Sequence, residues 1–182
     1  LQSVPIKKLL AVYFGGLEDN LGLAAQLPVD GLHLDLTRAP EQLDQILDRL
    51  PAYKVLSAGI IDGRNIWRAD LIHLAEFLAR AAERLGERLW LAPSCSLLHV
   101  PHDLQQEDQL DAELKNWLAF ARQKLDEVTL LAALVFGKLS PAQEKALAEN
   151  QAAQASRAHS ARIHNPQVAE RLASVDTAMY QR

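Results

Sequence analysis

Two polar side chains near residue 35 have the types and spacing that acid–base or metal chemistry requires. His33 and Asp35 are two positions apart in the apolar run GLHLDL, and an extended backbone places both on one face. An imidazole beside a carboxylate can bind a metal or move a proton. The alternative is a buried polar pair whose members satisfy each other. Both interpretations remain open from the sequence.

A second cluster, DGRNIWR, follows the apolar run VLSAGII and provides the candidate binding residues Asp62, Arg64, Asn65, Trp67 and Arg68. Two guanidinium groups and an amide suit an anionic ligand, because the planar guanidinium fork matches a carboxylate with two hydrogen bonds. A rigid, self-hydrogen-bonded loop between a strand and a helix is the alternative.

A third cluster, PSCSLLH, follows the run LWLAP and contains Ser94, Cys95 and His99. Ser94 is a further candidate for substrate binding. A thiol near a histidine suggests a nucleophile, but closeness in sequence decides nothing about pairing in space, and we favour a buried, inert Cys95. Gly15 and Gly16, after the first apolar run, indicate a tight turn or a close backbone approach to a ligand.

The elements that position these residues alternate between strand and helix patterns. Leucines spaced three and four apart indicate helices between the apolar runs, and repeated βα units imply parallel strands with crossover connections. The fold class is therefore α/β. The expected strands are Leu9–Phe14, Gly31–Leu36, Val55–Ile61 and Leu89–Pro93, and the expected helices are Leu17–Leu27, Pro40–Leu50 and Asp70–Leu85.

The second part of the chain reads as long helices. We expect them from Gln105 to about Phe136, from Pro141 to about Ile163 and from Pro166 to about Val175. Ser140 with Gln143 has the form of a capping box, Asn165 caps the last helix, and Gly137 ends the first. The Ala- and Gln-rich helix over 143–158 is expected to be largely exposed. We treat 1–182 as one partial domain, with four βα units over 1–103 and a helical segment over 104–182.

Four βα units correspond to half of a (βα)8 barrel, which needs about 250 residues in full. The alternative is an open sheet. A half barrel leaves two strand edges and one apolar sheet face that require a partner. The prediction is thus four βα units of a (βα)8 TIM-type barrel, followed by C-terminal helices.

Composition excludes several function classes. The chain has 182 residues, 49% of them hydrophobic and 23% charged, which is ordinary for a globular protein. A net charge of -4 argues against nucleic acid and anionic membrane partners. A single Cys excludes an internal disulfide, and we expect a cytoplasmic protein. The chain starts at Leu1 and its one Met is Met179, so we expect a piece of a longer protein.

Five segments together resemble the cobalamin-independent methionine synthase family, in the second half of its N-terminal domain. They occur in order and cover nearly the whole chain, and their combination is much more specific than any one of them. The segments are LPVDGLHLDL (Leu27–Leu36), DGRNIWRADL (Asp62–Leu71), APSCSLLHVP (Ala92–Pro101), LDAELKNWLAFARQKLDE (Leu110–Glu127) and SARIHNPQVAERL (Ser160–Leu172).

The resemblance implies a two-barrel methyltransferase that moves a methyl group from 5-methyltetrahydrofolate-oligoglutamate to homocysteine, with zinc activating the thiolate. The family's zinc ligands are His, Cys, Glu and Cys in the C-terminal barrel, so no catalytic or metal residue is assigned in this chain. Zinc is expected in the intact enzyme only. By analogy between the two barrels, Cys95 is a relic of a ligand position.

The partners implied by the resemblance are the first half of the N-terminal barrel and the C-terminal catalytic barrel. In this reading His33, Asp35, Arg64, Asn65 and Ser94 stabilise the barrel mouth, and the segment is inactive alone. A free-standing half-barrel binding or scaffold module that forms a homodimer is the alternative. A small enzyme with Cys95 as nucleophile is a third hypothesis.

Overall fold

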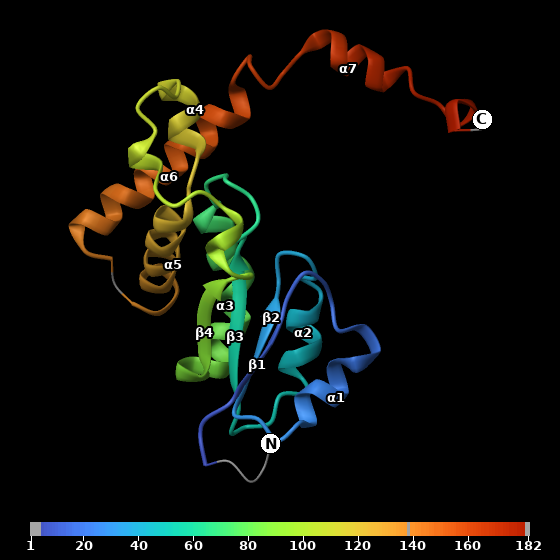
Figure 1. The fold of residues 1–182 in the computed structure, drawn as a ribbon, viewed down its shortest axis with the longest axis vertical. Helices are drawn as coiled ribbons and strands as arrows, with labels where there is room; N and C mark the ends of the chain where they lie inside the picture. Colours follow the sequence, from blue (N-terminus) through green and yellow to red (C-terminus); the bar gives the residue numbers. More distant parts are fainter. Residues whose placement is uncertain (1–4, 138, 181–182) are drawn as a thin grey trace.

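The centre of the structure is a four-stranded parallel sheet (Figure 1). The computed structural model describes residues 5–137 and 139–180. The strands lie in the order β1-β2-β3-β4, each parallel to its neighbours, which confirms the α/β class and the four expected strands. Their bounds are β1 Leu9–Val12, β2 Gly31–Asp35, β3 Val55–Ile61 and β4 Leu89–Pro93, so that the first two are shorter than the sequence pattern predicts.

The crossover segments between strands form the expected helices, although the first two are shorter than predicted. After β1 come a 3-10 turn at Glu18–Asn20 and α1 (Leu21–Gln26), and after β2 comes α2 (Gln42–Leu47). The third helix, α3 (Leu71–Leu85), begins where the Asp70 side chain accepts a hydrogen bond from the backbone N–H of His73. It ends at Gly86, whose φ of +53° favours glycine, and a 3-10 turn (Gly86–Arg88) leads into β4.

One face of the sheet forms the hydrophobic core against the helices. The register aligns Leu10, Leu32, Leu56 and Leu89 across the four strands, so these side chains share one face. Leu32, Leu56 and Leu89 are buried in one cluster with side chains of α1, α2, α3 and a later helix, while Leu10 packs against its edge. Burial of these aliphatic side chains stabilises the sheet at about 1.5–3 kcal/mol each.

The other face of the sheet is partly open to solvent. Ala11, His33, Ser57 and Trp90 form its central row, and Trp90 is 51% exposed. Leu9, at the start of β1, is 47% exposed. Among the described residues, β1 and β4 each pair with one neighbouring strand and so form the two edges. A four-stranded parallel sheet with one partly exposed face is compatible with a partial barrel.

The single helix predicted from Gln105 to about Phe136 is wrong. The segment after β4 contains 3-10 turns at Leu97–His99 and Leu104–Gln106, then α4 (Ala112–Trp117) and α5 (Ala121–Phe136). The chain is extended between α4 and α5 because Leu118 pairs with Trp67 in an antiparallel bridge. Two backbone hydrogen bonds fix this crossing, from Arg68 N to Trp117 O and from Ala119 N to Ile66 O, each 2.8 Å. Helix α5 then packs against α3 and β4.

The last helices begin at the predicted residues. Helix α6 (Pro141–His159) starts with the Ser140–Gln143 capping box, and α7 (Pro166–Ala173) starts at Asn165, whose side chain accepts from Gln167 N. Most of α6 is exposed as expected, apart from Asn150 and Ala153. Helix α7 has no buried residue and extends away from the sheet (Figure 1), ahead of a 3-10 turn at Thr177–Tyr180. No helix in the described part of the chain has the length and apolar character to cross a bilayer.

Candidate functional site

Central residues of β2 and β3 and residues at or just after the carboxyl ends of β2, β3 and β4 form one hydrogen-bonded group, here termed the strand-end cluster: His33, Asp35, Ser57, Ser94 and Gly63. The imidazole of His33 lies 2.9 Å from Ser57 Oγ through Nδ1 and 3.3 Å from Ser94 O through Nε2. A carbonyl accepts only, so a neutral His33 carries its proton on Nε2 and accepts from the Ser57 hydroxyl at Nδ1. Both ring nitrogens are therefore engaged inside the protein.

The Asp35 carboxylate holds the turns that follow β1 and β2. Its Oδ2 accepts from Phe14 N at 2.9 Å, and its Oδ1 accepts from the backbone N–H groups of Thr37 and Arg38 at 3.1 and 3.0 Å. The Thr37 hydroxyl donates to the same oxygen at 2.7 Å. Asp35 is almost fully buried, and these four donors compensate its charge. His33 and Asp35 share a face as predicted, but each is satisfied by other partners.

Ser94 joins the end of β4 to the loop after β3. Its hydroxyl accepts from Gly63 N at 3.1 Å, and its own N–H donates to Ile61 O at 2.8 Å. A Cβ on Gly63 would lie 3.0 Å from both the carbonyl oxygen and the sulfur of Cys95, so the close approach needs glycine there. Burial raises the pKa of the Cys95 thiol, which opposes the thiolate that a nucleophile requires. This supports the inert interpretation of Cys95.

We therefore expect Cys95 to react slowly with alkylating reagents. At about pH 8, iodoacetamide should label it at least roughly tenfold more slowly in the folded chain than after unfolding in urea, because the buried thiol stays protonated. Mass spectrometry of timed samples measures both rates. Equal alkylation rates in the folded and unfolded chain would show that the Cys95 thiol is reactive and would support the nucleophile hypothesis.

The loop after β3 is held by its own polar groups. Asp62 accepts from Arg64 N at 2.7 Å and from Asn65 Nδ2 at 2.9 Å, while Asn65 Oδ1 accepts from Trp67 N at 3.0 Å. Arg38 forms an ion pair with Asp62 at 3.4 Å. The self-hydrogen-bonded loop expected as the alternative is thus observed. Arg64 is exposed, and its guanidinium lies 4.9 Å from the centre of the Phe14 ring.

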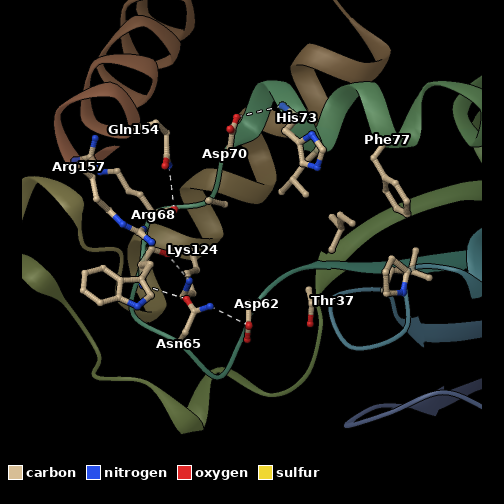
Figure 2. A pocket seen from close by; sticks show the side chains of 16 residues that line it. Thr37, Asp62, Asn65, Arg68, Asp70, His73, Phe77, Lys124, Gln154 and Arg157 are labelled. Carbon is tan, nitrogen blue, oxygen red and sulfur yellow. Dashed lines mark hydrogen bonds between the residues drawn. The ribbon is translucent and has the colours of Figure 1, made fainter. Parts of the chain in front are cut away.

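The same loop also lines a pocket of about 440 Å³ beside the start of α3 (Figure 2). Four candidates from the sequence, Asp62, Asn65, Trp67 and Arg68, contribute to its wall. The sequence pattern did not indicate the other polar wall residues, which come from the turn after β2, the start of α3 and the distant helices α5 and α6. These are Thr37, Asp70, His73, Lys124, Gln154 and Arg157.

Three buried polar residues of α5 and α6 hold the loop before α3, and the sequence analysis missed them. Glu127 Oε1 accepts from Ala69 N, and Asn150 Nδ2 donates to Ala69 O, each at 2.9 Å. The other carboxylate oxygen of Glu127, Oε2, and the amide oxygen of Asn150, Oδ1, have no hydrogen-bond partner among the described residues. Lys124, also fully buried, donates to Trp67 O at 3.1 Å. The sequence signal that could have indicated them is the pair Lys124 and Glu127, charged residues three positions apart and therefore on one face of a helix.

Burial raises the pKa of Glu127 to about 7, against the attraction of Lys124. The folded-state value lies above the usual 4.5, so folding favours the protonated carboxyl, and this contribution is lost as the pH rises from 4.5 through about 7. In urea unfolding, stability should fall between about pH 5 and pH 8 more steeply for the original chain than for Glu127→Gln.

The matched control for Glu127→Gln is Glu149→Gln. Both carboxylates line a second pocket, distinct from that of Figure 2, but Glu149 is exposed. Glu149→Gln should leave the pH dependence of stability unchanged. Identical pH dependence in the original chain and Glu127→Gln would contradict the raised pKa.

Metal ligands do not converge in the described part of the chain. No group of three or more His, Cys, Asp or Glu side chains there has an arrangement that could hold a metal ion. The strand-end cluster is chemically a set of satisfied hydrogen bonds that fixes the ends of the strands and their loops.

Parallel strands joined by helices, with polar residues at the carboxyl ends of the strands, define an α/β protein of the βα-repeat class. Residues 2–86 match the family model described as the N-terminal domain of cobalamin-independent synthase. The match confirms the resemblance to the N-terminal domain of the methionine synthase. It contains β1–β3, His33, Asp35 and the loop of Asp62–Arg68.

Proposed function

We propose that this chain is the second half of the N-terminal barrel of a cobalamin-independent methionine synthase, where it has a structural and substrate-positioning role and no activity alone. The family match over residues 2–86 supports the parent enzyme. The four parallel strands with one open face support an incomplete barrel. In the intact enzyme the reaction would be methyl transfer from 5-methyltetrahydrofolate-oligoglutamate to homocysteine, in the cytoplasm, with zinc bound by the other barrel.

The structural role is supported mainly by the hydrogen bonding of the strand-end cluster, whose polar side chains already have partners within the protein. Both nitrogens of His33 and both carboxylate oxygens of Asp35 have protein partners. A general acid or base needs a free donor or acceptor facing its substrate. These side chains instead tie β2 to β3, β4 and the loop after β1, which suits the mouth of a barrel.

A chimera tests this function. The corresponding segment of an active family member is replaced by residues 1–182, and methionine formation is measured with purified protein. Turnover should be retained, because the segment supplies the scaffold and not the reacting groups, whereas the isolated chain should form no methionine. A folded chimera without turnover, or methionine formation by the isolated chain, would overturn the proposal.

A second candidate function, a scaffold module that forms a homodimer, is favoured by the open face and the two free edges. A two-fold axis parallel to the strands would bring β4 of each copy beside β1 of the other and keep all eight strands parallel. Exposed Leu9 and Trp90 would then be covered inside the closed barrel. A discrete dimer of the isolated chain in light scattering would support this candidate, and a monomer would exclude it.

A further inference from the structure

The pocket beside the start of α3 has a cationic end and an apolar end. Figure 2 shows Arg68, Lys124 and Arg157 together at one end and Phe77 at the other. Leu36, Pro40, Ile60 and Leu74 complete the apolar wall. A volume of about 440 Å³ lies in the range of small-molecule sites. The pocket lies on the helix side of the sheet, because Leu36 and Ile60 belong to the core cluster.

The three cationic groups form no close carboxylate contact in the described part of the chain, although Glu127 attracts Lys124 and Arg68 at longer range. Among the described residues, none of Arg68, Lys124 and Arg157 forms an ion pair. The Arg157 guanidinium lies 4.6 Å from the centre of the Trp67 ring, and the Lys124 ammonium has a single hydrogen bond, to Trp67 O. Burial lowers the pKa of Lys124, with Glu127 and Asp62 opposing the shift. A buried cation with one acceptor is costly unless an anion compensates it.

The acidic groups in the pocket wall are already engaged. Asp62 accepts two hydrogen bonds within its own loop and pairs with Arg38, and Asp70 caps α3. They are therefore poor partners for the cationic end. An incoming anion would find unused N–H donors on Arg68 and Arg157.

We propose that this pocket binds a small organic acid, with its carboxylate at Arg68 and Arg157, close to the buried charge of Lys124, and its apolar ring or chain along Ile60, Leu74 and Phe77. A guanidinium recognises a carboxylate through two parallel hydrogen bonds, which fixes the orientation of the acid. The apolar wall selects acids that carry a hydrocarbon body over acetate or an inorganic anion. This site is separate from the strand-end cluster and does not depend on the proposed function.

Three probes of related structure test the chemistry: phenylacetate, acetate and 2-phenylethylamine. Binding to the 182-residue chain is measured by calorimetric titration and saturation-transfer NMR. Phenylacetate should bind at least about tenfold more tightly than either other probe, since acetate lacks the apolar ring and 2-phenylethylamine lacks the carboxylate. Absence of saturable phenylacetate binding, or equal binding of 2-phenylethylamine, would overturn the proposal.

Substitutions locate the site. Arg157→Met keeps an unbranched apolar stem and removes the charged guanidinium, and it should weaken phenylacetate binding at least about tenfold. Lys145→Met, which removes a charge from the exposed side of the same helix, should leave binding unchanged. If Arg157→Met lowers the melting temperature, the same binding measurement is made with Arg68→Met. Unchanged binding in a folded arginine variant would contradict this site.

Discussion

Replacing Asp35 by Ala should lower the free energy of unfolding by about 3–5 kcal/mol, because four donors lose a buried, charged acceptor. Three backbone N–H groups, of Phe14, Thr37 and Arg38, point at this carboxylate. Alanine supplies no acceptor, and water has little access to a position that is 1% exposed. Urea unfolding followed by circular dichroism measures the change.

The control for Asp35→Ala is Asp44→Ala, which removes an exposed carboxylate paired with Arg80 on the helix side of the molecule. Its cost should be below about 1 kcal/mol, as for other surface ion pairs. Asp35→Asn, which keeps one acceptor oxygen, should fall between the two. A cost for Asp35→Ala as small as that for Asp44→Ala would show that the strand-end cluster does not hold the loops.

The second large effect is expected for Trp117→Ala, with a loss of about 3–5 kcal/mol. Trp117 is 1% exposed at the end of α4, and its Nε1 donates to Ser156 Oγ of α6 at 3.2 Å. Its carbonyl also accepts from Arg68 N in the antiparallel crossing. Removing the indole leaves a cavity between the helical segment and the loop after β3. Thermal and urea unfolding of the variant measure this loss.

Tyr53→Ala is the matched aromatic control, because Tyr53 is 69% exposed before β3. It should cost less than about 1 kcal/mol. If Trp117→Ala lost no more stability than Tyr53→Ala, the helices over 112–159 would not be docked on the βα units as described.

Local sequence patterns were sufficient to predict the sheet and most helices. Each strand is a short segment rich in Leu, Val, Ile or Ala, because alternate side chains pack into the core, and α3 has both its cap at Asp70 and its glycine end at Gly86. The helix predicted across Gln105–Phe136 failed for a non-local reason. Residues around Leu118 pair with the loop around Trp67, and this pairing overrides helix propensity.

The candidate site was predictable only in part. Alternation along β2 places His33 and Asp35 on one face, but the partners of His33 are Ser57 and Ser94 from the next two strands, and a single sequence does not contain that pairing. The loop residues Trp67 and Arg68 enter a pocket whose cationic end depends on Lys124 and Arg157 from distant helices. Long-range packing, not local pattern, decides which polar groups are satisfied.

The most direct test of the incomplete barrel is the behaviour of the open sheet face in solution. Light scattering and dye binding with 1-anilinonaphthalene-8-sulfonate are measured on the isolated chain and on a variant with Leu9→Glu and Trp90→Glu, two residues exposed in the structure. We expect the original chain to self-associate or bind the dye through this face, and the variant to do so much less without losing its fold. A monodisperse monomer that binds no dye would contradict a face that requires a partner.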